Sequence, residues 1–283
     1  MLTIFTIPKP FTGENLINQR NAILSWKNST KDAQIILWGD DEGVEEYSEK
    51  LSVEYGGKVP RNNYGTPLIS EVFERTKSIA KNQYLMYINA DIILLNDFNS
   101  IITNVLESLE KHAIVCGRRT DCNLNRSLDF SSDWIQDLKL NVLPYGQLHS
   151  YTGIDYFLFS KSIPVKLKPF AVGRPGWDNW FLFYAKKNNI LILDASEIIS
   201  AIHQNHKPAY TIKDTETKEN QRMLNGFIQV ANIYHSDFIL NQNGLHRPKL
   251  LRRLASYLSI TFPFFYLFAI RRWYLNSGKF HKK

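Results

Sequence analysis

The chain has 283 residues, of which 44% are hydrophobic and 22% are charged; this suits one large globular domain and excludes a disordered or collagen-like chain. The formal net charge of +7 favours a nucleic-acid partner at first sight. However, nine basic and no acidic residues lie between positions 247 and 283, whereas residues 1–246 carry 25 basic and 27 acidic residues. The excess positive charge therefore belongs to the C-terminal segment.

The first half of the sequence alternates short apolar runs with segments of helical spacing. This alternation predicts β-strands joined by α-helices, and hence a mostly parallel sheet with right-handed crossovers. Gly65-Thr66-Pro67 predicts the start of a further helix, with Thr66 as N-cap and Pro67 in the first turn. The predicted strands are residues 2–7, 34–38, 84–88 and 113–117, and the predicted helices are residues 14–27 and a polar helix ending near residue 50.

The second half is less regular. It predicts strands at residues 156–159 and 190–193, a helix at residues 177–187, and a last core strand ending near His203. The polar residues 205–221 indicate a loop or lid. We expect a globular domain at residues 1–245 and a basic, aromatic tail at residues 246–283. Cys116 and Cys122 lack CxxC spacing, so we expect both to stay reduced in a cytosolic compartment.

An aspartate interrupts the apolar stretch that follows the predicted strand 84–88. Asp91 stands in Asn89-Ala90-Asp91, with apolar residues on both sides. An ionised carboxylate is costly to bury there unless it is paired or binds a metal. In open α/β sheets ligands bind at the carboxyl ends of the strands, where Asp91 is expected. The alternative is that Asp91 only caps the turn after the strand.

Two further polar segments are candidates for nucleotide contacts. An acidic turn containing Asp40 and Asp41 follows the predicted strand 34–38, and Arg61 precedes the helix start predicted at Pro67. A guanidinium and a helix N-terminus both suit phosphate. The alternatives are a plain turn, since Asp and Gly are common turn formers, and a surface salt bridge of Arg61.

A turn rich in glycine and proline delivers Asp178 between two tryptophans, where a helix is predicted to begin. The sequence reads Gly173-Arg174-Pro175-Gly176-Trp177-Asp178-Asn179-Trp180. Aromatic faces beside a carboxylate are a common way to hold a sugar ring and its hydroxyl groups. The alternative is that Asp178 caps the helix and the tryptophans pack in the core.

The chain resembles GT-A-fold nucleotide-sugar glycosyltransferases of the family-2-like, bacterial surface polysaccharide type, over about residues 1–210. The resemblance rests on four motifs in chain order: the acidic turn at Asp40 and Asp41, Asn89-Ala90-Asp91, Gly176-Trp177-Asp178-Asn179 and His203-Gln204-Asn205-His206. Asn89-Ala90-Asp91 retains only the second acidic position of their Asp-x-Asp motif. The resemblance implies a Rossmann-type, mostly parallel sheet flanked by helices. It also implies that Asp91 holds Mn²⁺ or Mg²⁺ on the two phosphates of the donor, with His203 or His206 as an additional metal ligand. The alternatives for either histidine are a hydrogen bond to a phosphate and a plain loop residue.

The resemblance further implies a role for each remaining candidate. Asp178 would be the general base that deprotonates the acceptor hydroxyl in an inverting reaction, and Asp155 would accept hydrogen bonds from the donor sugar. The alternative for Asp155 is a carboxylate at a strand edge that binds no ligand. The implied donor- and nucleotide-binding residues are Pro8, Asp40, Asp41, Arg61, Asn89 and Asp155, and the implied acceptor-binding residues are Trp177 and Asn179.

The C-terminal segment has a chemistry of its own. Residues 254–270 are uncharged and rich in aromatic residues, and a pair of arginines flanks them on each side. A spanning helix needs about 20 apolar residues, so we expect the segment to lie in the interface of an anionic membrane. The alternative is a C-terminal helix packed on the domain.

The sequence therefore predicts a metal-dependent glycosyltransferase that moves a sugar from a nucleotide-diphosphate donor to a hydroxyl of a lipid-linked or growing glycan. We expect it to be cytoplasmic, peripheral on the inner face of the plasma membrane, and without a nucleic-acid partner. One alternative is a sugar nucleotidyltransferase, although Pro8-Lys9-Pro10 stands where that class has a glycine-rich loop. Another is a non-catalytic, membrane-docked glycan-binding protein.

Overall fold

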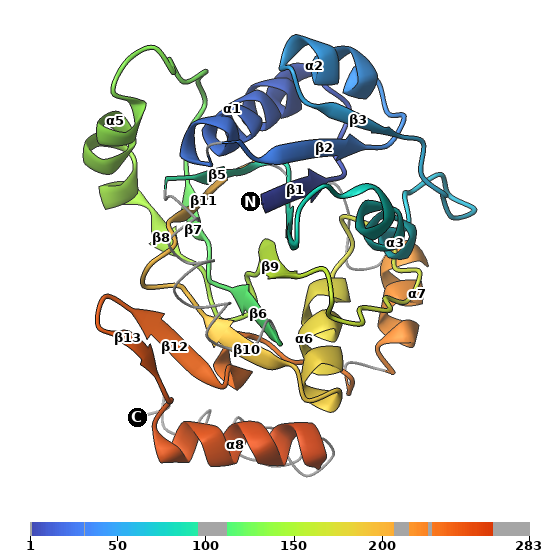
Figure 1. Ribbon diagram of the computed structural model, residues 1–283, viewed down its shortest axis with the longest axis vertical. Helices are drawn as coiled ribbons and strands as arrows, with labels where there is room; N and C mark the ends of the chain where they lie inside the picture. The colour runs from blue at the N-terminus through green and yellow to red at the C-terminus, as the bar shows by residue number, and fades with distance from the viewer. Residues whose placement is uncertain (1, 31, 96–111, 207–214, 226–227, 263–283) are drawn as a thin grey trace, which may run out of the picture.

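The computed structural model describes residues 2–30, 32–95, 112–206, 215–225 and 228–262 (Figure 1). The strands of its large sheet are β1 (Leu2–Thr6), β2 (Gln34–Trp38), β3 (Glu54–Gly57), β4 (Tyr84–Ile88), β6 (Ala113–Cys116), β9 (Tyr156–Ser160), β10 (Leu191–Asp194), β12 (Phe238–Asn241) and β13 (Gly244–His246). A second sheet contains β5 (Ile92–Leu94), β7 (Thr120–Cys122), β8 (Gln147–Leu148) and β11 (Ala201–Gln204).

The large sheet is mostly parallel and has the order β13-β12-β10-β6-β9-β4-β1-β2-β3. β1 is parallel to β2 and β4, and β10 is parallel to β6 and β12. β9 is antiparallel to both of its neighbours, β4 and β6, and β13 is antiparallel to β12. The fold class expected from the sequence, a mostly parallel sheet flanked by helices, is thereby confirmed.

Both faces of this sheet are covered, which explains why its strands read as continuous apolar runs. In β4, Met86 and Ile88 pack with α1 (Gly13–Ser29) and α2 (Val44–Lys50) on one face. Leu85 and Tyr87 pack with α3 (Ile69–Ile79) and α6 (Trp177–Lys187) on the other. Helices on both faces leave the ends of the strands as the place for a ligand.

The helix start predicted at Thr66 and Pro67 is wrong. α3 begins at Ile69, and its N-cap is Leu68 in an extended conformation. Pro67 forms an antiparallel bridge with Arg61, and the Leu68 N–H donates to the Pro60 carbonyl at 2.9 Å. Because these tertiary contacts keep the segment extended, the helix cannot begin until after Leu68.

Two other expectations need correction. β11 is not the last strand of the core, because β12 and β13 follow it. Residues 215–221 are not a loop, because they lie in α7 (Thr215–Met223), while residues 207–214 are outside the described residues. The Asn220 side chain accepts from the Ala171 N–H and donates to its carbonyl, at 3.1 Å each, which anchors α7 to the domain.

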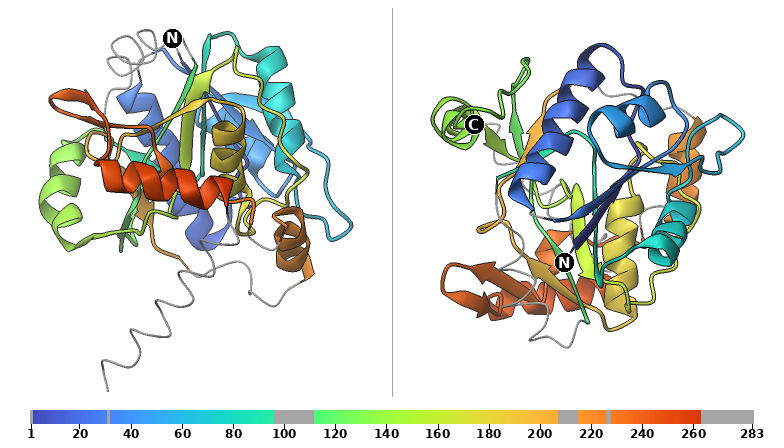
Figure 2. Two further views of the ribbon diagram at one scale, coloured as in Figure 1. Left: turned by 90° about the horizontal axis from the view of Figure 1, so that it is seen from below. Right: turned by 45° about the horizontal axis from the view of Figure 1, so that its top comes forward.

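The C-terminal helix α8 (Leu250–Thr261) lies on the side of the molecule opposite to α2, with its whole length on the outside (Figures 1 and 2). Arg252 donates to the carbonyls of Ile233 and Tyr234 in the 3-10 turn η3 (Ile233–His235). Ile260 joins the hydrophobic core beside α6. None of the described helices is both long and apolar enough to span a bilayer. The division of the chain at residue 245 stays a prediction.

The remaining described elements lie between β7 and β9. α5 (Trp134–Asn141) and the 3-10 turn η2 (Leu143–Tyr145) cover the second sheet with their own apolar cluster.

Cys116 and Cys122 are both free and buried. Burial raises the pKa of both thiols, which makes them poor nucleophiles.

Candidate active site

A cleft of about 440 Å³ opens where β1 and β4 end, a size typical of sites for small ligands. The loop after β1 supplies Pro8 and Lys9 to its wall, and the turn after β4 supplies Asn89 and Asp91. The wall also contains Arg119, Asp155, Trp177, Asp178, His203 and His206. The cleft thus lies at the carboxyl ends of neighbouring parallel strands, as expected from the sequence.

Asp91, His203 and His206 form one cluster, in which one ligand atom of each lies within 4.8 Å of the others. Asp91 Oδ2 is 2.9 Å from His206 Nε2. The buried side chain of Gln204 donates to the Asp91 carbonyl at 3.1 Å, which ties the turn after β4 to β11. This explains how residues more than a hundred positions apart come together.

The charges of this cluster suit a cation. Burial alone would raise the pKa of Asp91, but the hydrogen bond with His206 and the charge of Lys9 hold it well below its usual range. Burial lowers the pKa of His203, so its imidazole is neutral at pH 7. Asp91 Oδ1 is buried and has no hydrogen-bond partner among the described residues. A carboxylate with a spare oxygen and two imidazoles are donors that fit a divalent metal ion.

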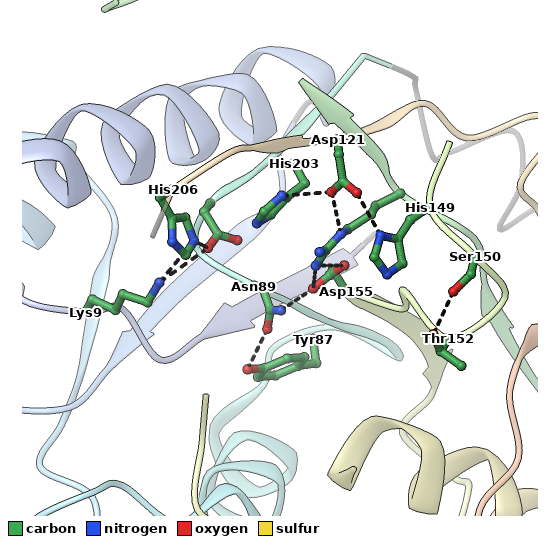
Figure 3. Close-up of polar contacts among 12 residues, drawn as sticks. Lys9, Tyr87, Asn89, Asp121, His149, Ser150, Thr152, Asp155, His203 and His206 are labelled. Carbon is green, nitrogen blue, oxygen red and sulfur yellow. Dashed lines mark hydrogen bonds and ion pairs between the residues drawn. The ribbon is translucent and has the colours of Figure 1, made fainter. Parts of the chain in front are cut away.

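Asn89 lies in a hydrogen-bond chain across the floor of the cleft (Figure 3). Tyr87 Oη donates to Asn89 Oδ1 at 3.1 Å, and Asn89 Nδ2 donates to Asp155 Oδ1 at 2.5 Å. Arg119 also donates to Asp155, with 3.0 Å between Nη1 and Oδ2. A carboxylate at position 89 would repel the buried Asp155, which gives a physical reason for an amide at the first position of the motif.

A second carboxylate, Asp121 on β7, connects this chain to the histidines (Figure 3). Its Oδ1 accepts from Arg119 Nε at 2.8 Å and lies 3.0 Å from His203 Nδ1. Its Oδ2 is 2.7 Å from His149 Nδ1. Burial, hydrogen bonding to His149 and the charge of Arg119 act on Asp121, and the net effect is a lowered pKa. Asp121 therefore stays ionised and is placed to orient His203.

Asp178 lies in the first turn of α6 and lines the same cleft. The turn before it needs Gly176, whose φ is +110° and whose added Cβ would lie 2.3 Å from a Leu224 methyl group. Burial raises the pKa of Asp178 to about 7, and the nearby charge of Asp155 adds to the shift. The Asn179 N–H, which donates to Asp178 Oδ1 at 2.9 Å, opposes it. Such a carboxyl group can accept a proton near neutral pH.

Not every residue singled out in the sequence lines the cleft. Arg61 is held by Asp40 Oδ1 at 2.7 Å and Asp41 Oδ2 at 3.2 Å, and of these three only Asp41 lines the cleft. Asn179 is also outside the lining, and its carbonyl accepts from Ala231. Trp177 does line the cleft, although its ring packs edge-on against Tyr87 with centroids 4.9 Å apart.

Sequence reasoning missed Lys9 and Arg119, which line the cleft. It also missed Asp121 and His149, which lie outside the lining, where Asp121 contacts both Arg119 and His149. Lys9 was noted only because Pro8-Lys9-Pro10 is not a glycine-rich loop. The others follow β6 and flank β8, where no motif marks them. The one available signal was Arg118-Arg119-Thr120-Asp121, a cluster of charges directly after a buried strand.

No protein-family model and no curated protein sequence matches the chain. Solved structures of S. aureus TarS are similar to it. The structure of TarS residues 1–349 in complex with UDP-GlcNAc is 13% identical with a TM-score of 0.49, covering 92% of this chain and 73% of that one. The complex with UDP is 12% identical with a TM-score of 0.48, covering 81% and 65%.

A third TarS structure, 10% identical with a TM-score of 0.47, is matched over 81% of this chain. The match spans only 43% of the length of that TarS chain. These identities and TM-scores are too low to assign a function, so the functional argument rests on the residues of the cleft.

Proposed function

We propose that the protein is a metal-dependent glycosyltransferase of the GT-A type, which moves a sugar from a nucleotide-diphosphate donor to a hydroxyl group. The observation that carries the proposal is a pair of aspartates in one cleft, Asp91 and Asp178, whose pKa values are shifted in opposite directions. Metal-assisted, inverting sugar transfer uses both kinds of carboxylate, one that stays ionised beside a cation and one that takes up a proton near pH 7.

Asp91, His203 and His206 would hold the metal ion of this enzyme. A divalent cation bound there supplies positive charge that stabilises the diphosphate leaving group. Of the two ions expected from the sequence, Mg²⁺ prefers an all-oxygen set, whereas imidazole suits the transition metals. We therefore favour Mn²⁺ over Mg²⁺.

The remaining residues divide between donor and acceptor. Asp155 and Asn89 offer acceptor and donor groups for the hydroxyls of the transferred sugar, and Asp41 extends the cleft towards the nucleotide. Asp178 would remove the proton from the acceptor hydroxyl as that oxygen attacks the sugar, which gives an inverting reaction. Its pKa of about 7 allows it to act as a base without holding the proton too tightly.

Two alternatives are less favoured. A sugar nucleotidyltransferase would use a glycine-rich loop after the first strand, but the loop here is stiffened by Pro8 and Pro10. A non-catalytic glycan-binding protein would not need a carboxyl group with a pKa near 7 in its cleft, nor the buried unpaired oxygen of Asp91.

Calorimetry with a panel of nucleotide sugars, each with Mn²⁺ or with EDTA, tests the proposal. We expect at least one nucleotide sugar to bind in a Mn²⁺-dependent manner and to transfer its sugar to a hydroxyl acceptor. Absence of Mn²⁺-dependent binding across the panel would contradict the enzyme assignment. Binding without any transfer or hydrolysis of the donor would favour the glycan-binding alternative.

We also propose that α8 docks the protein on an anionic membrane surface. Its outward side is apolar, with Leu251 81% exposed, whereas Arg252 turns inward and pairs with the domain. Three exposed basic residues lie in the helix or just before it: Arg247, Lys249 and Arg253. An apolar stripe with cationic flanks is typical of interfacial helices on anionic lipid. The stripe consists of Leu250, Leu251, Leu254, Tyr257, Leu258 and Phe262.

Such docking implies a cytoplasmic enzyme, peripheral on the plasma membrane, that acts on a lipid-linked or growing glycan during surface polysaccharide assembly. Residues 263–270 of the uncharged segment lie outside the described residues. Co-sedimentation with phosphatidylglycerol vesicles tests the docking. The double variant Leu251→Glu, Leu254→Glu should lose binding, whereas Leu140→Glu, at a 61% exposed position on α5, should retain it. Equal binding of both variants would contradict the proposal.

A further inference from the structure

Lys9 places a positive charge inside the cluster assigned to the metal ion (Figure 3). Its Nζ lies 3.2 Å from His206 Nε2 and 3.7 Å from Asp91 Oδ2, while the same His206 nitrogen is 2.9 Å from Asp91. A neutral imidazole nitrogen carries either one hydrogen or one lone pair. His206 Nε2 can therefore accept a hydrogen bond from Lys9 or donate one to Asp91, but not both. The contacts of the Lys9 ammonium group are longer than the contact between His206 and Asp91, so Lys9 is the most weakly held of the three side chains.

Hydrogen bonds with Gln19 fix the backbone of Lys9, whereas its side chain is partly exposed to solvent. The Lys9 N–H donates to Gln19 Oε1 at 2.6 Å, and its carbonyl accepts from Gln19 Nε2 at 3.0 Å. Pro8 and Pro10 restrict the loop on both sides. The Lys9 side chain is 35% exposed and lines the cleft, so its ammonium group can move there without any movement of the loop.

Two positive charges compete for Asp91 in this arrangement. A divalent cation on Asp91 and His206 repels an ammonium group that contacts the same two residues. The diphosphate of a donor, which carries several negative charges, attracts that ammonium group instead. The metal ion and the donor therefore both move Lys9 in the same direction, away from Asp91 and towards phosphate.

We propose that Lys9 is a diphosphate-binding residue that pairs with Asp91 and His206 until a divalent cation takes its place, and then binds the phosphate oxygens of the donor. This inference rests on the proposed function and adds a residue to it. Lys9 weakens metal binding to the free protein and strengthens donor binding to the metal-loaded protein. A lysine that only balanced the charge of Asp91 would leave donor binding unaffected.

The two opposite effects give the test. Mn²⁺ binding to the full chain is measured from the electron paramagnetic resonance signal of free Mn²⁺, without nucleotide. Binding of UDP, GDP, ADP and CDP is then measured by calorimetry at saturating Mn²⁺. In Lys9→Met we expect Mn²⁺ to bind about fivefold more tightly than in the unmodified protein. We expect the nucleotide that the unmodified protein binds to bind the variant about tenfold more weakly. The control is Lys81→Met, which removes an exposed lysine paired with Glu54 outside the cleft.

Each outcome is decisive. Tighter Mn²⁺ binding is a gain that a misfolded variant cannot produce, so it supports the inference together with weaker nucleotide binding. If the unmodified protein binds Mn²⁺ and a nucleotide but Lys9→Met leaves either affinity unchanged, the role of Lys9 is overturned and the proposed function stands. If the unmodified protein binds neither Mn²⁺ nor any nucleotide, the proposed function fails and the role of Lys9 fails with it.

Discussion

Two aspartates of the cleft, Asp91 and Asp178, lie in opposite electrostatic surroundings. Both Asp91 and Asp178 are withdrawn from solvent, which by itself raises the pKa of a carboxyl group. Around Asp91, the hydrogen bond with His206 and the charge of Lys9 reverse that effect and keep the carboxylate ionised. Around Asp178, burial dominates and the charge of Asp155 adds to it, so the pKa rises to about 7. Since both carboxyl groups are withdrawn from solvent, the opposite directions of their pKa shifts come from their different partners.

Removal of the negative charge of Asp91 should have the largest effect on donor binding and sugar transfer. In Asp91→Asn the cluster keeps its two imidazoles but loses its only negative charge. We expect Mn²⁺-dependent donor binding to disappear and sugar transfer to fall by about 10³-fold or more. Calorimetry and product analysis measure the two effects. Asp129→Asn, at an exposed carboxylate in the loop after β7, is the control and should change neither. Donor binding in Asp91→Asn with an unchanged response to Mn²⁺ would contradict the assignment.

Removal of the carboxyl group of Asp178 should affect sugar transfer alone. In Asp178→Asn we expect transfer to fall by about 10²-fold or more, while Mn²⁺-dependent donor binding stays as in the unmodified protein. The amide is nearly isosteric and is too weak a base to accept the proton. Turnover near that of the unmodified protein would show that another group removes the acceptor proton.

The pH dependence of transfer sharpens the same comparison. Because Asp178 must be ionised to act as a base, activity should rise with pH and level off above its pKa of about 7. Below that value the rate should fall about tenfold for each pH unit. Among the described residues, Asp155 and Tyr87 interact electrostatically with Asp178, and burial raises the pKa of Tyr87, which leaves it neutral throughout. The acidic limb should be absent from the residual activity of Asp178→Asn.

A smaller effect is expected from Asp121, which lies against His203, one of the proposed metal ligands. In Asp121→Asn, His203 loses a charged neighbour at 3.0 Å, and Mn²⁺ affinity should fall by about tenfold. Asp137→Asn, at a surface position paired with Arg126, is the matched control. Equal Mn²⁺ affinities in the two variants would show that Asp121 only supports the fold.

Much of this arrangement was accessible from the sequence, because its strands are marked by apolar runs and its turns by glycine. The strand at residues 84–88 and the helix at residues 177–187 have the predicted bounds, and so Asp91 and Asp178 were correctly placed after a strand and in a first helical turn. The start of α3 was wrong, because the bridge of Pro67 with Arg61 is a tertiary contact that overrides local helix signals.

Four polar residues near the two aspartates were harder to predict from the sequence: Lys9, Arg119, Asp121 and His149. Asp121 lies on a strand of only three residues, whose partners β11 and β8 are distant in sequence. No local period marks such a strand, so the one signal for Arg119 and Asp121 was the cluster of charges after β6, and His149 had none. Lys9 was visible in the sequence, but its role depends on His206, which lies 197 positions away.

The most direct test of the contrast between the two aspartates is an NMR titration of the full chain with ¹³C-labelled aspartate carboxyl groups. The proposed mechanism predicts one aspartate that titrates near pH 7 and is missing from the spectrum of Asp178→Asn. It also predicts that the Asp91 resonance, identified with Asp91→Asn, shows an ionised carboxylate well below the usual aspartate range. If both carboxyl groups titrate at ordinary aspartate values, the division of roles between Asp91 and Asp178 is wrong.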